Sequence, residues 1–227
     1  MAHAFFLGVD VAPSDEDPPH DVTHALFEKS TEGGNDGATY RLDHIRHHTD
    51  IASADKLADH LQGLVAKQPY IGRTSLIVNR STNFGRALVD ALEDRGMDPV
   101  AAILTEGSGV AAGDTDEIGV HLGGVDTVCT IADLHRDRKI ALEGYTTEVA
   151  SRLARDVQAL AEQLDEADGD LEALGTSTSG PSFDPEAIHV TSAALAVWFG
   201  TERSFDPSQH LKESPQTDSM GARDLSA

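Results

Sequence analysis

Three strand-like segments come first in this chain, before any helical periodicity appears. Ala4–Val11 is a short apolar run that ends in turn-forming residues, and similar segments follow at Val22–Lys29 and Thr39–His48. A Gly-Asn-Asp-Gly turn at residues 34–37 separates the second segment from the third. Short apolar runs bounded by Gly, Pro, Asn and Asp are typical of strands, and a tight turn between two of them predicts an antiparallel hairpin. The chain should therefore begin with a meander of three strands.

Helical and strand patterns alternate after this meander. An amphipathic helix is predicted over Ser53–Gln68, a strand over Thr74–Val78, a helix from the N-cap Asn83 to Arg95, and a strand over Pro99–Leu104. A strand–helix–strand passage of this length implies parallel neighbours in one sheet. Residues 105–124 are rich in Gly, Asp and Thr and are expected to form a loop.

The second half of the chain is mainly helical in pattern. Helices are predicted over Val125–Leu134, Thr147–Leu164 and Pro185–Phe199, with a short strand over Lys139–Leu142. The predicted organisation is a core of residues 1–164, a flexible polar linker, 165–184, a closing helix of the same domain, 185–199, and a disordered tail, 200–227.

Net charge distinguishes this chain from most α/β proteins. It has 39 acidic and only 17 basic residues, which gives a formal charge of −22. Such self-repulsion is tolerable where salt screens it, because the Debye length falls from about 10 Å at 0.1 M salt to about 3 Å at 1 M. The acidic residues are scattered rather than grouped in blocks, which favours adaptation to concentrated salt, as in haloarchaeal proteins, over an acidic partner-binding segment. In such a setting net charge neither supports nor excludes DNA binding.

Several classes of protein are not expected from the composition. Cys129 is the single cysteine, so neither a disulfide framework nor a thiolate metal site is predicted. No apolar run approaches the roughly 20 residues of a membrane span, and the first residues lack the pattern of a signal peptide. A cytoplasmic protein without membrane partners is expected.

Two short motifs carry a resemblance to a known family. Gly8-Val9-Asp10 places an acid near the end of the first strand, and the segment 76–92 reads LIVNRSTNFGRALVDAL. This segment resembles the strand–loop–helix passage of terminase nuclease domains from tailed viruses, which reads roughly V-V-D-x-T-G-x-G-R-P-V-V-D-L-L. The segments 96–107, 138–142 and 193–198 follow in the order of that family. The resemblance covers about residues 4–199.

The resemblance implies a ribonuclease H-like α/β fold, in which a mixed sheet of a three-strand meander followed by parallel strands is flanked by helices. It also implies metal-dependent hydrolysis of DNA with Mg²⁺ or Mn²⁺ by a viral or provirus protein, with DNA and virus packaging or assembly proteins as partners. Asp10 would be the central catalytic residue and metal ligand, with Asn79, Glu186 and His189 as its catalytic partners. Arg80 and Arg86 flank the second position and could contact phosphates or pair with nearby carboxylates.

The catalytic positions of this chain differ from the family pattern. Asn79 stands where the family has its second Asp, and the acidic pair before the closing helix would fall near Ala187 and Ile188. An amide offers a metal one neutral oxygen in place of a charge, so metal affinity should fall. The alternative is therefore an inactive relative that serves as a binding or assembly module. A motor ATPase is not expected, because the chain has no G-x-x-x-x-G-K-[ST] loop.

Histidines are concentrated in the third predicted strand. His44 and His48 should face one side of the sheet and His47 the other, because side chains alternate along a strand. A metal site here would need a third ligand from elsewhere in the fold.

Overall fold

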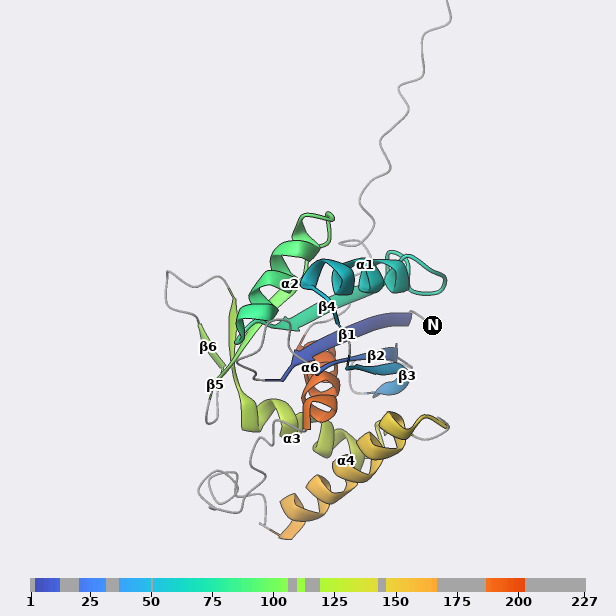
Figure 1. Cartoon of the computed structure of the whole chain (residues 1–227). Helices are drawn as coiled ribbons and strands as arrows, with labels where there is room; N and C mark the ends of the chain where they lie inside the picture. Colours follow the sequence, from blue (N-terminus) through green and yellow to red (C-terminus); the bar gives the residue numbers. More distant parts are fainter. Residues whose placement is uncertain are drawn as a thin grey trace, which may run out of the picture.

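A sheet of eight strands runs through the middle of the molecule, with helices on both faces (Figure 1). The structure is a computed structural model, and it describes residues 3–12, 21–31, 37–49, 51–105, 110–112, 119–142, 146–166 and 187–202. Within these residues, no helix combines the length and the apolarity needed to cross a lipid bilayer.

The sheet begins with an antiparallel meander and continues with parallel strands. β1 (His3–Val11) pairs antiparallel with β2 (Val22–Thr31), and β2 pairs antiparallel with β3 (Ala38–His48). On its other side β1 pairs parallel with β4 (Thr74–Asn79), which pairs parallel with β5 (Val100–Thr105). The strand order is β6-β7-β5-β4-β1-β2-β3-β8. The predicted ribonuclease H-like mixed sheet is confirmed.

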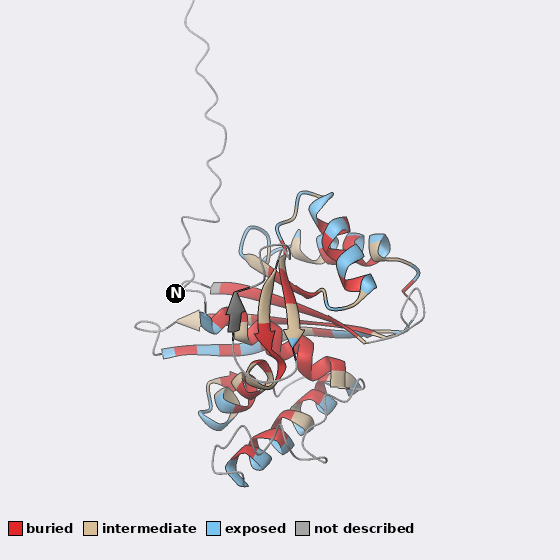
Figure 2. Cartoon of the chain, turned by 90° about the vertical axis from the view of Figure 1, so that its left-hand side faces the viewer, coloured by how far each residue is buried: buried red, intermediate tan, exposed pale blue. Residues whose placement is uncertain are grey.

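Two helical layers enclose this sheet. α1 (Ala54–Val65) and α2 (Asn83–Glu93) cover one face, and α3 (Gly124–Arg136), α4 (Glu148–Glu166) and α6 (Ile188–Glu202) cover the other (Figure 1). Alternate residues of β1 contribute to the two cores: Phe5 and Leu7 pack with α1 and α2, whereas Ala4 and Phe6 pack with α6. Both faces of the central strands are therefore buried, as Figure 2 shows.

Helix α6 lies directly on β1 and is buried on nearly all sides. A Cβ atom at Gly8 would lie 2.1 Å from the carbonyl oxygen of Ser192, so only glycine allows this close approach. Lys29 is buried, and its Nζ donates a hydrogen bond of 2.7 Å to the carbonyl of Gly200 near the end of the helix. A helix that is apolar all round is expected where protein covers every side.

The prediction of a loop over residues 105–124 is wrong in part. Two short strands, β6 (Val110–Ala112) and β7 (Val120–Gly123), form an antiparallel pair there, and β7 pairs parallel with β5. They have three and four residues, which is too short for a reliable alternating pattern. The short strand expected over Lys139–Leu142 is β8 (Ile140–Ala141), which pairs with β3.

Several predicted helix ends also differ from the structure. Thr82, not Asn83, is the N-cap of α2, because its hydroxyl accepts a hydrogen bond of 3.0 Å from the backbone N–H of Gly85. α1 ends at Val65, ahead of Pro69, which disfavours helical geometry in the residue before it. α6 begins at Ile188 and extends to Glu202, past the expected end at Phe199.

The predicted linker and tail overlap with these helices at their ends. α4 continues to Glu166, and residues 200–202 belong to α6 rather than to a tail. The rest of the predicted linker, the rest of the predicted tail, residues 34–36 of the predicted turn and Glu186 lie outside the described residues.

Candidate functional site

Asp10 and Asn79 meet at the carboxyl ends of two neighbouring strands. Asp10 is near the end of β1 and Asn79 ends β4, and the parallel register pairs Val9 with Val78 immediately before them. Both side chains are buried, with 4% of Asp10 and 7% of Asn79 exposed. The structure therefore brings together the first two residues of the predicted site.

Protein donors surround the Asp10 carboxylate. Its Oδ1 accepts hydrogen bonds from Asn79 Nδ2 at 2.6 Å and from the backbone N–H of Val11 at 2.9 Å. The side chain of Thr191, from the first turns of α6, is a further hydrogen-bond partner. A carboxylate oxygen has two lone pairs, so these two donors saturate Oδ1.

The hydrogen bond accepted by the side-chain oxygen of Asn79 fixes the orientation of its amide group. Asn79 Oδ1 accepts a hydrogen bond of 3.0 Å from the backbone N–H of Ser81. Because the oxygen must face this N–H, the NH₂ group must face Asp10. Asn79 thus presents a hydrogen-bond donor, not an oxygen ligand, to Asp10.

The electrostatic surroundings of Asp10 are those of a buried acid in a neutral environment. Burial raises the pKa of Asp10 from 3.8 to about 6, and the hydrogen bonds from Asn79, Val11 and Thr191 oppose this rise only in part. No charged side chain is among the causes of the shift. In the described part of the chain, His24, His48 and His60 are the one group of three or more histidine, cysteine or carboxylate side chains close enough to share a metal ion, so Asp10 does not belong to such a group.

His189, which was predicted as a catalytic partner of Asp10, has a hydrogen-bond partner in α4. Its Nε2 lies 2.7 Å from Asp156 Oδ2 of α4, and this contact turns the ring towards α4. Burial lowers the pKa of His189, and Asp156 partly opposes the shift. Glu186, the other predicted partner, lies outside the described residues. The one side-chain hydrogen bond given for His189 is to Asp156, and a catalytic role for His189 beside Asp10 stays a prediction.

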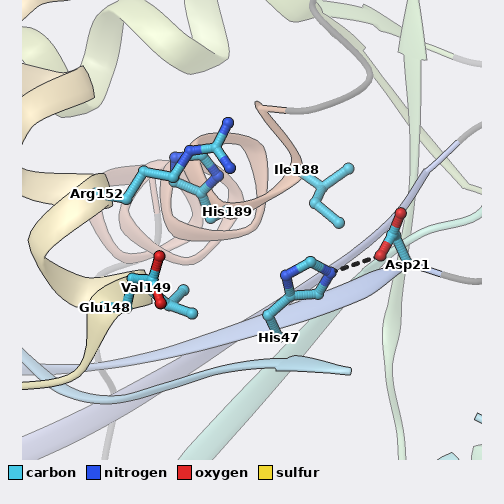
Figure 3. Close-up of a pocket in the computed structure, with 7 residues that line it drawn as sticks. All are labelled: Asp21, His47, Glu148, Val149, Arg152, Ile188 and His189. Carbon is cyan, nitrogen blue, oxygen red and sulfur yellow. Dashed lines mark hydrogen bonds and ion pairs between the residues drawn. The ribbon is translucent and has the colours of Figure 1, made fainter. Parts of the chain in front are cut away.

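His189 instead lines a polar cavity of about 370 Å³ between β3, α4 and α6 (Figure 3). Across this cavity His47 Nε2 lies 2.8 Å from Asp21 Oδ1, so this histidine–carboxylate pair and the His189 ring face one space. The remaining lining residues are Glu148, Val149, Arg152 and Ile188. The cavity lies on the Asp10 face of the sheet, because Thr23 is paired with Asp10 on one side and with His47 on the other.

The two predicted phosphate-contact residues are placed differently. Arg86 bonds through its guanidinium to the side chain of Asn83 on the exposed side of α2. Arg80 follows Asn79, and its backbone N–H donates a hydrogen bond of 2.8 Å to Ala102 of β5. A phosphate-binding role for either side chain stays a prediction.

The sequence analysis identified His44 and His48 on one face of a strand but missed His24 and His60, which lie beside them. His44 and His48 share one face of β3 with His24 of β2 and His60 of α1, while His47 points to the other face as predicted. The signal that could have revealed His24 is the hairpin register, which places it opposite Arg46, between His44 and His48. His60 gives no comparable signal, because its position depends on how α1 packs.

The chain has no match among protein-family models, among curated proteins or among solved structures. The sites described above therefore rest on their own geometry.

Proposed function

We propose that this chain is a ribonuclease H-like relative of viral terminase nuclease domains that serves as a binding or assembly module and does not hydrolyse DNA. The observation that supports this most directly is the Asn79 amide, which donates a hydrogen bond of 2.6 Å to Asp10 at the position where a nuclease needs a second anion.

The surroundings of Asp10 do not favour a hydrated metal ion. Mg²⁺ takes oxygen ligands in near-octahedral geometry and keeps several of its waters. Oδ1 of Asp10 already accepts two hydrogen bonds, and only 4% of the residue is exposed. An ion entering at the other oxygen, Oδ2, would have to bring its waters into a nearly closed space beneath α6.

The start of the closing helix also lacks the acids of the family pattern. Ile188 is buried and lines the polar cavity, and Ala187 packs against the hydrophobic core that includes α6. Two apolar side chains thus stand where the resemblance would place two metal ligands. The replacement of two acids by two apolar residues favours a structural role for α6 over a catalytic one.

The expected partner of such a module is a protein of virus packaging or assembly. The chain carries 39 acidic against 17 basic residues, so its surface repels phosphate backbones in dilute salt. Concentrated salt removes that repulsion but also removes the counterion-release term that makes DNA binding favourable. Net charge therefore supplies no attraction to DNA in either condition, and it does not by itself exclude DNA as a partner.

Phosphodiester hydrolysis is the second candidate function, and one observation favours it. Asp10 lies on β1, Asn79 on β4 and Thr191 on α6, and both Asn79 and Thr191 bond to Asp10. In an active ribonuclease H-like site, the first strand, the fourth strand and the closing helix also bring their catalytic residues together. In that case Asp10 would hold Mg²⁺ or Mn²⁺, with Asn79, Glu186 and His189 as the remaining candidates, and the metal would activate water for attack on the phosphodiester.

A nicking assay decides between the two candidates. Supercoiled plasmid is incubated in molar KCl with Mg²⁺ or Mn²⁺ and with wild-type protein, Asp10→Asn or Asp10→Ala. We expect the same background nicking in all three, because no catalytic metal binds. Asp10→Asn keeps the size of the side chain, so loss of activity in that variant could not be ascribed to unfolding. Metal-dependent nicking by the wild type that disappears in Asp10→Asn would overturn the proposal in favour of the nuclease.

A further inference from the structure

Four histidines from three elements gather on the α1 side of the sheet. His24 comes from β2, His44 and His48 from β3, and His60 from α1. The ring centroid of His24 lies 5.2 Å from that of His44, 5.0 Å from that of His48 and 5.6 Å from that of His60. His48 and His60 are 5.2 Å apart by the same measure. We call these four residues the histidine cluster.

Local structure accounts for this convergence. The β2–β3 register pairs His24 with Arg46, so His44 and His48, two residues before and after Arg46, project to the same face as His24. α1 covers this face by packing Leu57 and Leu61 against the apolar residues of β2, which brings His60 over the hairpin. The cluster therefore links α1 to the hairpin.

Ring nitrogens of the cluster have the spacing of metal ligands. His24 Nδ1 and His48 Nε2 are 3.0 Å apart. Two imidazole nitrogens on one tetrahedral Zn²⁺ ion, each at about 2.0–2.1 Å from the metal, are about 3.3 Å apart. One nitrogen each of His24, His48 and His60 can be chosen so that all three lie within 4.8 Å of one another. Small side-chain rotations, chiefly of His60, would complete three bonds.

One hydrogen bond, between His24 Nδ1 and His48 Nε2, lies within the cluster, and it leaves other ring nitrogens unpaired. The Nε2 atoms of His24 and His60 are both buried and have no hydrogen-bond partner. His24 is fully buried, so its ring has no access to solvent. Buried polar atoms are nearly always paired, and an unpaired one suggests a ligand. His24 can give one ion only one nitrogen, either Nδ1 beside His48 or the unpaired Nε2, so the unpaired atom that adds to the spacing argument is Nε2 of His60.

The protonation state of the cluster suits a metal. Burial lowers the pKa of all four histidines, and for His48 the value falls to about 4. Neutral imidazole is the form that binds metals. Arg46 is the one opposing cation that faces all four rings, and it is exposed, so its guanidinium can move away into solvent.

We propose that His24, His48 and His60 bind a late first-row divalent ion of the Zn²⁺, Co²⁺ or Ni²⁺ class and so tie α1 to the β2–β3 hairpin. Three imidazoles leave a fourth position for water or for His44, whose ring stacks on His24. Imidazole nitrogen selects these ions over Mg²⁺ and Mn²⁺, which prefer oxygen ligands. The site is independent of Asp10, which faces the opposite layer of helices.

The test uses Co²⁺ as the probe, because its visible absorption reports nitrogen coordination. Co²⁺ is titrated into metal-free protein in molar KCl with an excess of Mg²⁺, which occupies the many surface carboxylates. We expect one equivalent to bind with the absorption of a four- or five-coordinate site. His48→Ala and His60→Ala should each weaken binding by at least about 100-fold, because loss of a ligand costs more than loss of an outer-shell partner.

The matched control is His47→Ala, on the same strand but facing the cavity on the other side of the sheet. This variant should bind Co²⁺ as the wild type does. Arg46→Gln should bind Co²⁺ several-fold more tightly, because it removes the cation that opposes all four rings, although Lys67 still acts on His60. Far-ultraviolet circular dichroism of each metal-free variant shows whether it is folded.

A second measurement separates a built site from loose association. Co²⁺ should raise the thermal midpoint of the wild type and of His47→Ala, but not that of His60→Ala, and EDTA should reverse the rise. Co²⁺ binding of equal strength in wild type, folded His48→Ala and folded His60→Ala would overturn the proposal. So would a wild type that takes up no Co²⁺ in the presence of Mg²⁺.

Discussion

The Asp10 carboxyl group couples the stability of the fold to pH. Its pKa in the folded chain is raised from 3.8 to about 6 by burial, so between these values the folded state holds a proton that the unfolded state has released. The free energy of unfolding therefore falls as pH rises through this window. The difference between 3.8 and about 6 corresponds to on the order of 3 kcal/mol at neutral pH.

Asp10→Asn should remove this loss of stability. The new amide oxygen would still accept from Asn79 and Val11, and its NH₂ group could donate to the Thr191 hydroxyl. We expect the variant to be about 1–3 kcal/mol more stable than the wild type at pH 7 and close to it at pH 4. Urea denaturation at both pH values, in constant molar KCl, measures the difference. If Asp10→Asn is less stable than the wild type at pH 7, the prediction is wrong, and the Asp10 carboxylate must be compensated, for example by a bound cation.

Asn79→Asp restores the acid of the family pattern and should be strongly destabilising. It replaces the donor 2.6 Å from Asp10 with a second buried carboxylate. We expect a loss of about 3–5 kcal/mol in the free energy of unfolding at pH 7, since an uncompensated buried charge is costly.

The exchanged pair Asp10→Asn/Asn79→Asp should recover much of this loss, because one hydrogen-bond donor again faces one carboxylate. Urea denaturation of wild type, both single variants and the double variant gives the coupling energy. If Mn²⁺ stabilises Asn79→Asp but not the double variant, two carboxylates at these positions are sufficient to bind a metal.

At the scale of elements, the long periodic segments were predictable, whereas of the short strands only β8 was predicted and β6 and β7 were not. The meander, the β4–α2–β5 unit and the closing helix follow from apolar runs and turn residues, whereas β6 and β7 have too few residues for such a pattern. The resemblance led us to expect Asp10 and Asn79 at one site, and they meet because β1 and β4 are parallel neighbours. The contact of His189 with Asp156 was not predicted, because the position of α4 follows from packing and not from sequence order. The same limit applies to His60 on α1.

The contact between β1 and α6 can be tested with two glycines. A Cβ at Gly8 would lie 2.1 Å from the Ser192 carbonyl oxygen and 2.8 Å from the Ala196 nitrogen, both backbone atoms that cannot rotate away. Gly8→Ala should therefore cost about 3 kcal/mol or more and displace α6. Gly63→Ala is the control, since nothing lies within 4 Å of its Cβ and it should stabilise α1 by about 0.5–1 kcal/mol. Urea denaturation compares the two. Equal stability of Gly8→Ala and wild type would contradict this packing.

At the scale of the whole molecule, the dominant feature is the formal charge of −22. Neither the sheet nor the hydrophobic cores depend on this charge, because the buried side chains are mostly apolar. The charge opposes the compact state as a whole, and salt weakens this opposition as the Debye length shortens. We therefore expect the free energy of unfolding to rise with KCl concentration and to level off near 1–2 M, where the Debye length is about 3 Å or less.

Two charge reversals should reduce this dependence on salt. Glu93 and Glu166 are exposed and end α2 and α4, whose last turns contain no basic residue. Glu93→Lys/Glu166→Lys changes the net charge from −22 to −18, because each exchange adds two positive charges, and it places cations at two helix carboxyl ends.

We expect the double variant to be about 1–2 kcal/mol more stable than the wild type in 0.2 M KCl, with a difference below about 0.5 kcal/mol in 2 M KCl. Thermal and urea unfolding across a KCl series measures both values. Glu93→Gln/Glu166→Gln should show a smaller gain, since it adds half the charge. An advantage of the lysine variant that stays constant from low to high KCl would mean that local helix contacts, and not net repulsion, make this chain depend on salt.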